Sequence, residues 1–79
     1  MLKRVKRITS HAGYARFLAE CEDTSYSIPR QADIPSPYAY SPEWDVWDYQ
    51  GKHVIVRETA HKRYDVFMVP DALLAQRTD

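Results

Sequence analysis

The chain has 79 residues, and eleven basic side chains balance eleven acidic ones, so its formal charge is zero. A chain of this length buries only about 60–65% of its unfolded surface, which leaves room for one hydrophobic core and excludes a two-domain protein. The hydrophobic fraction of 44% includes six Tyr, two Trp and two Phe residues, and this content excludes intrinsic disorder. The sequence therefore predicts a single small domain over residues 1–79.

A single cysteine, Cys21, excludes an internal disulfide framework, and a lone cysteine is typical of a reducing cytoplasm. No apolar run approaches the roughly 18 residues of a membrane span, and none of signal-peptide length follows the basic N-terminus. We therefore expect a cytoplasmic protein with no membrane partner.

The balanced charge is the sum of three unequal segments. Residues 1–16 hold five basic residues and no acid, residues 17–50 hold seven acids and only Arg30, and residues 51–79 hold five basic and four acidic residues. This segregation indicates separate basic and acidic binding faces. The alternative is that a basic first strand lies beside the acidic middle segment and is neutralised by it.

The first half of the chain predicts three strands. The basic segment LKRVKRITS leads to a turn closed by Gly13. Residues 14–21 (YARFLAEC) are apolar at every second position from Ala15 to Cys21, which is the period of a half-buried strand. The same residues are good helix formers, so a helix is the main alternative. Gly13 and the EDTS cluster bracket the segment at hairpin spacing and favour the strand, and SYSIP then predicts a short strand that ends at Pro29.

The second half begins with an irregular connection. Prolines fix the backbone over residues 30–43, which predicts an extended or turn-like loop. The following EWDVWDY is interpreted as a short strand or a turn of helix. HVIVRET and RYDVFMVP predict a hairpin, because both are rich in β-branched or aromatic residues and are joined by AHKR. Asp71 is placed to cap a short terminal helix, DALLAQR.

These elements predict an all-β fold, a small five-stranded OB-like or SH3-like barrel with a short C-terminal helix. Closing the sheet would protect the edges of so small a domain. The long connection between the third and fourth strands favours the OB type, which normally carries a loop or helix there.

Two stretches resemble small OB-fold nucleic-acid binders. Residues 4–34 read RVKRITSHAGYARFLAECEDTSYSIPRQADI and are similar to the first three strands of cold-shock domains, with a Gly-aromatic step at Gly13 and Tyr14. Residues 51–69 read GKHVIVRETAHKRYDVFMV and resemble the last hairpin of cold-shock domains and of bacterial translation initiation factor one. The resemblance implies an OB fold and a role in nucleic-acid binding.

In an OB fold the ligand face uses strands two and three and the loops that join strands one to two and four to five. These elements bring together cations for phosphates and rings for stacked bases, the two needs of single-stranded nucleic acid. The predicted nucleic-acid-binding residues are Arg7, His11, Tyr14, Arg16, Tyr26, Arg57, His61, Lys62 and Arg63. The alternative is that they are ordinary surface residues, with Tyr14 and Tyr26 as a cross-strand pair.

Bulky rings and carboxylates alternate in PYAYSPEWDVWDYQ, residues 37–50. Exposed Trp and Tyr side chains are typical anchors of protein interfaces, and the carboxylates would favour a partner with a basic surface. The predicted protein-partner residues in loop 35–50 are Tyr38, Tyr40, Glu43, Trp44 and Asp45. Alternatively Trp44, Trp47 and Tyr49 close the end of the barrel, which leaves Tyr38 and Tyr40 as the exposed rings.

No catalytic or metal site is predicted. The three histidines and Cys21 lack zinc-ligand spacing, and Cys21 is expected to be a small core residue. His11, His61 and Lys62 would support acid–base chemistry on RNA only if their loops are neighbours. We therefore expect a non-enzymatic module of bacterial or phage type, without cofactor, that binds single-stranded RNA or DNA. The alternative is a protein-interaction or inhibitor module, a phage- or plasmid-type regulator.

Overall fold

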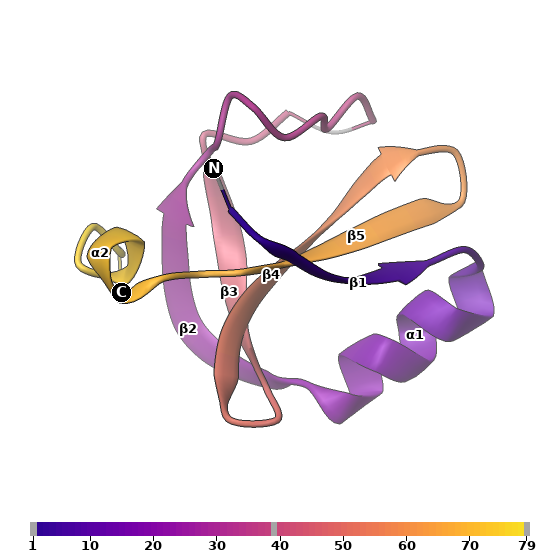
Figure 1. The fold of residues 1–79 in the computed structure, drawn as a ribbon, viewed down its shortest axis with the longest axis horizontal. Coiled ribbons are helices and arrows are strands. Elements are labelled where there is room, and N and C mark those ends of the chain that lie inside the picture. The colour runs from indigo at the N-terminus through magenta and orange to yellow at the C-terminus, as the bar shows by residue number, and fades with distance from the viewer. Residues whose placement is uncertain (1, 39, 79) are drawn as a thin grey trace.

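The computed structural model describes residues 2–38 and 40–78, and it contains one antiparallel sheet and two helices (Figure 1). The strands lie in the order β1-β5-β4-β3-β2. Their bounds, with those of the helices, are β1 Arg4–Ile8, α1 His11–Glu20, β2 Glu22–Pro29, β3 Glu43–Tyr49, β4 Lys52–Ala60, β5 Arg63–Met68 and α2 Asp71–Leu74. The mostly β fold with five strands is thus confirmed. In the described residues β1 and β2 do not pair with each other, so they form the two edges of an open sheet.

The strand predicted over residues 14–21 is wrong, because this segment forms the helix α1. Its buried or half-buried side chains include Tyr14, Phe17, Leu18 and Cys21, which recur at helical spacing on one face. The two-residue period was misleading because Ala15 and Ala19 share the parity of Phe17 but are exposed. The spacing of the larger side chains, four residues from Tyr14 to Leu18 and from Phe17 to Cys21, carries the correct signal.

The start of α1 is fixed by local contacts that the hairpin interpretation missed. Ser10 is the N-cap, and its Oγ accepts a hydrogen bond of 3.0 Å from the backbone N–H of Gly13. A Cβ atom at Gly13 would lie 3.0 Å from Ile8 Cγ2 and 3.1 Å from Ser10 Oγ. Gly13 is therefore inside the first helical turn, where its lack of a side chain lets α1 lie close to β1.

The other predicted strands and the loop are confirmed with small changes of length. β2 ends at Pro29 as expected, a proline that fits an edge strand because it cannot donate to the ladder. EWDVWDY is the strand β3, which shortens the irregular connection to residues 30–42. β2 pairs with β3 along one side only. On its other side, the backbone groups of Ser27 and Thr78 exchange two hydrogen bonds of 2.8 Å.

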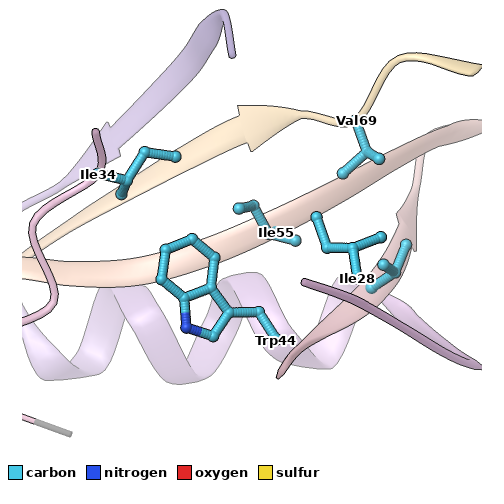
Figure 2. Packing of buried hydrophobic residues seen from close by; sticks show 6 residues of the cluster. Ile28, Ile34, Trp44, Ile55 and Val69 are labelled. Carbon is cyan, nitrogen blue, oxygen red and sulfur yellow. The ribbon is translucent and has the colours of Figure 1, made fainter. Parts of the chain in front are cut away.

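Hydrophobic residues cover both faces of the sheet. The α1-side core contains Ile8, Phe17, Val54, Tyr64 and Val66. The loop-side core contains Ile28, Ile34, Trp44, Val46, Ile55 and Val69 (Figure 2). Loop residue Ile34 and the α2 residues Leu73 and Leu74 cover this second cluster. Because neighbouring residues of a strand point to opposite faces, Val54 and Ile55 belong to different cores.

Candidate functional site

Basic and acidic residues lie at opposite ends of the sheet. β1, which carries Arg4, Lys6 and Arg7, is one edge strand and pairs only with β5 among the described residues. The acid-rich strands β2 and β3 lie at the other end. The first strand therefore does not pair with a strand of the acidic segment, as the alternative interpretation expected. The strands that carry the basic and the acidic segments are thus separated in the sheet, although Glu20 and Asp33 of the acidic segment line the hollows beside β1.

Two hollows flank β1 and share Arg7. The α1-side hollow has a volume of about 360 Å³ and is lined by Lys6, Arg7 and Arg16, with Glu20 as its acid. The loop-side hollow, of about 480 Å³, is lined by Arg4, Arg7 and Arg63, with Asp33 and Asp65 as its acids. We call the five cations of these hollows, Arg4, Lys6, Arg7, Arg16 and Arg63, the basic edge.

Asp65 holds the arginines of the loop-side hollow in place. Arg7 donates to its two carboxylate oxygens at 2.7 and 3.3 Å, Thr59 Oγ1 donates at 2.7 Å, and Arg4 lies 3.9 Å away. Burial by itself would raise the pKa of Asp65, but the hydrogen bonds from Arg7 and Thr59 outweigh it and hold that pKa below its ordinary value. Arg63 in turn donates to Thr59 Oγ1 at 3.3 Å. The hollow therefore carries three guanidinium groups, two of them beside a carboxylate that is ionised at neutral pH and the third bound to Thr59.

Part of the predicted nucleic-acid face is brought together here. Arg7, Arg16 and Arg63 all belong to the basic edge. His61 and Lys62 are exposed in the turn between β4 and β5, directly before Arg63 in the chain.

His11 and Tyr14 are instead engaged with the hairpin strand β5. The Tyr14 ring stacks on Tyr64 with centroids 4.2 Å apart and an interplanar angle of 7°. The Tyr64 hydroxyl lies 2.6 Å from His11 Nδ1. Burial raises the pKa of Tyr14. One face of the Tyr14 ring is thus occupied by the protein itself, and the ring lies on α1 and not on the exposed strand that was expected.

Tyr26 and Arg57 lie on the other side of the sheet from α1. Tyr26 packs against the loop-side core under Arg77, whose Cζ is 4.7 Å from the ring centroid. Arg57 lies over Trp44 at 4.6 Å. The expected surface that joins Tyr14 and Arg16 to Tyr26 is therefore not formed, because α1 carries the first two to the opposite face.

The protein-partner candidates divide into exposed and buried residues. Tyr38 and Tyr40 are 55% and 80% exposed, as the proline-flanked loop predicts, and Glu43 and Asp45 are also exposed. Trp44 is only 1% exposed and belongs to the loop-side core. Trp44 is therefore not available for contact with a partner in this conformation.

Sequence reasoning missed Asp65, Thr59, Arg4 and Arg30 as members of charged clusters. The available signal was position: Asp65 interrupts an apolar strand, and a carboxylate inside such a strand needs a cation or hydrogen-bond donors nearby. The half-buried Cys21 contacts the α1-side core, and burial raises the pKa of its thiol. Within residues 2–38 and 40–78 no group of His, Cys, Asp or Glu is arranged to hold a metal ion.

Comparison with known proteins gives no relative. No protein-family model, curated protein or solved structure matches this chain. Neither helix of the described residues is long and apolar enough to cross a membrane.

Proposed function

We propose that the protein is a non-enzymatic module that binds single-stranded nucleic acid along the basic edge. The observation that carries this proposal is the pair of hollows around Arg7, which places cations from β1, α1 and β5 on both sides of one exposed strand. A flexible single strand can follow such an edge and place successive phosphates near successive cations.

Phosphate contacts would supply most of the affinity. Arginine presents a planar set of donors that fits phosphate oxygens, and cations at the protein surface release counterions from the nucleic acid on binding. Stacking contributes less, because Tyr14 packs on Tyr64 and Tyr26 lies on the far side of the sheet. The sheet is open, not a closed barrel, but the proposed mode of binding, through a strand and its neighbouring turns, is that of the predicted OB-like or SH3-like modules.

Salt dependence tests this proposal. We expect affinity for short single-stranded DNA or RNA, measured by fluorescence anisotropy, to fall steeply between about 50 and about 200 mM salt. The double variant Lys6→Gln/Arg16→Gln removes two cations of the α1-side hollow. It should reduce the slope of log affinity against log salt by roughly 1 to 2, because each lost phosphate contact removes about one unit.

Lys52→Gln is the matched control, since Lys52 is an exposed lysine at the start of β4 and lines neither hollow. It should leave the slope unchanged. Binding that is absent at low salt, or equal losses in Lys52→Gln and the double variant, would contradict the role of the basic edge. A duplex that binds as tightly as a single strand would contradict the preference for single strands.

A second candidate function is supported by the exposure of Tyr38 and Tyr40. Two large rings that stay in solvent on a proline-flanked loop, beside Glu43 and Asp45, are suited to anchor a protein partner with a basic surface. In this function the protein is an interaction or inhibitor module that acts through its acidic end.

Ring removal tests the second candidate. We expect Tyr38→Ala to leave the urea midpoint within the small range typical of surface substitutions, about 0.5 kcal/mol, because the side chain is more than half exposed. The immobilised wild type should capture one specific protein from a lysate of the cells that produce it naturally. Tyr38→Ala should no longer capture this protein, whereas Lys52→Gln should still capture it. Unchanged capture, or unfolding caused by Tyr38→Ala, would count against this function.

A further inference from the structure

Among the residues that the structure describes, three buried side-chain nitrogens near loop 30–42 have no hydrogen-bond acceptor. They are Arg30 Nη1, Arg57 Nε and Trp44 Nε1. Leaving a buried donor unpaired costs roughly 1–3 kcal/mol, so native proteins seldom tolerate several together. We call these three residues the Arg30–Arg57 cluster.

The cluster joins two guanidinium groups at one indole ring. The Cζ atom of Arg57 lies 4.6 Å from the Trp44 ring centroid, and that of Arg30 lies 5.6 Å from it. Arg57 donates to Ser36 Oγ at 2.7 Å. Among the described residues neither arginine forms an ion pair with a carboxylate. Two cations therefore share one aromatic ring without a counterion.

Electrostatics makes this arrangement unfavourable as it stands. Burial lowers the pKa of Arg57, and the nearby charge of Arg30 lowers it further. Asp45 acts in the opposite direction but is exposed on β3. Cation–π contact with Trp44 stabilises each guanidinium, yet it satisfies none of the free N–H groups. An anion bound between the two arginines would offset the repulsion between their charges and would accept hydrogen bonds from the unpaired N–H groups.

The cluster extends outward to solvent through Tyr40. The Arg30 Cζ atom lies 4.8 Å from the Tyr40 ring centroid, and Tyr40 is 80% exposed. Trp44, at the inner end, is 1% exposed. Figure 2 shows the nitrogen of Trp44 on the side of the ring that faces away from Ile55 and Val69. The free indole N–H is thus directed away from the hydrophobic packing of the loop-side core.

We propose that the Arg30–Arg57 cluster is a binding site for a phosphate group in its dianionic form. Two guanidinium groups match two negative charges, whereas a carboxylate would neutralise only one of them. The planar donor set of arginine fits the oxygens of phosphate, and the indole N–H supplies a third donor. This site uses none of the five cations of the basic edge, although loop 30–42 also lines the loop-side hollow.

Titration of the intact protein with inorganic phosphate tests the site. In a Trp47→Phe background, Trp44 is the remaining tryptophan, so its fluorescence reports on the cluster itself. We expect phosphate to change this fluorescence, broaden the ³¹P resonance and raise the melting temperature, all saturably. Chloride at equal ionic strength should do none of these. Identical effects of chloride and phosphate would overturn the proposal.

Charge-removing variants locate the binding. Arg30→Gln and Arg57→Gln should each weaken phosphate binding at least roughly tenfold, because each removes a charge-assisted donor. Lys52→Gln, which removes an exposed cation that belongs neither to the cluster nor to the basic edge, should bind phosphate like the wild type. If either cluster variant folds and keeps wild-type affinity, the site is elsewhere and the proposal fails. If both variants unfold, the fluorescence titration of the Trp47→Phe protein still tests the proposal, because a Trp44 signal that does not saturate with phosphate would contradict it.

Adenosine monophosphate distinguishes a free phosphate from the phosphate of a nucleotide. Tighter binding than inorganic phosphate, lost in Tyr40→Ala, would support a nucleotide whose base stacks on Tyr40. Equal binding of both would support free phosphate as the ligand. The proposals for the basic edge and for the Arg30–Arg57 cluster can be tested independently. Arg30→Gln should leave the salt dependence of nucleic-acid binding unchanged, and Lys6→Gln/Arg16→Gln should leave phosphate binding at the cluster unchanged.

Discussion

Phe17→Ala should destabilise the domain by about 3–5 kcal/mol, the usual cost of removing a buried phenylalanine. Phe17 is 3% exposed, and its ring centroid lies 4.7 Å from that of Tyr49. It is the buried residue through which α1 packs on the sheet. A domain of 79 residues has a total stability of only roughly 4–12 kcal/mol, so this variant should lose a large part of that stability. Urea unfolding followed by circular dichroism and fluorescence measures the loss.

Ala15→Gln is the control on the same helix. Ala15 is exposed on α1, so a longer polar side chain there should change stability by less than about 0.5 kcal/mol. A strand over residues 14–21 would instead place Ala15 on the same buried face as Phe17. Losses of similar size in Phe17→Ala and Ala15→Gln would therefore contradict the helix. The pair of variants tests the largest difference between the predicted and the observed fold.

Hydrophobic pattern predicted the sheet well and residues 11–21 poorly, and the reason is physical. The strands β4 and β5 have β-branched or aromatic residues on both faces, which few other structures accommodate. In α1, small alanines satisfy the periods of both strand and helix, so only the spacing of the large side chains distinguishes them. The contact that selects the helix, Gly13 against Ile8, joins two elements and becomes evident only when they are packed.

The candidate sites depended even more on long-range packing. The sequence showed a basic segment, and the structure added that β1 is an edge strand whose flanking hollows share Arg7. No local pattern indicates that Arg30 and Arg57, 27 positions apart in the chain, meet at Trp44. The exposure of Tyr38 and Tyr40 was predictable, since flanking prolines keep that loop out of the sheet.

Asp65→Asn should destabilise the protein by about 2–4 kcal/mol at neutral pH, the range for breaking a buried, hydrogen-bonded ion pair. Asp65 is 4% exposed and accepts hydrogen bonds from Arg7 and Thr59. An amide has the same shape, but it lacks the charge and turns one of two acceptors into a donor. The cation of Arg7 then keeps only a weak partner. Glu43→Gln, which removes one exposed carboxylate at the other end of the sheet, should change stability by less than about 0.5 kcal/mol.

The pH dependence of stability separates charge from packing at Asp65. Because the folded state holds the pKa of Asp65 below its ordinary value of about 3.9, the ionised carboxylate stabilises the wild type fully above that pH. The stabilisation is lost as the pH falls through the lower pKa of the folded state. The difference in unfolding free energy between the wild type and Asp65→Asn should therefore be constant above about pH 5 and shrink below about pH 4. A difference that stays constant to lower pH would mean that amide geometry, and not the lost charge, destabilises the variant.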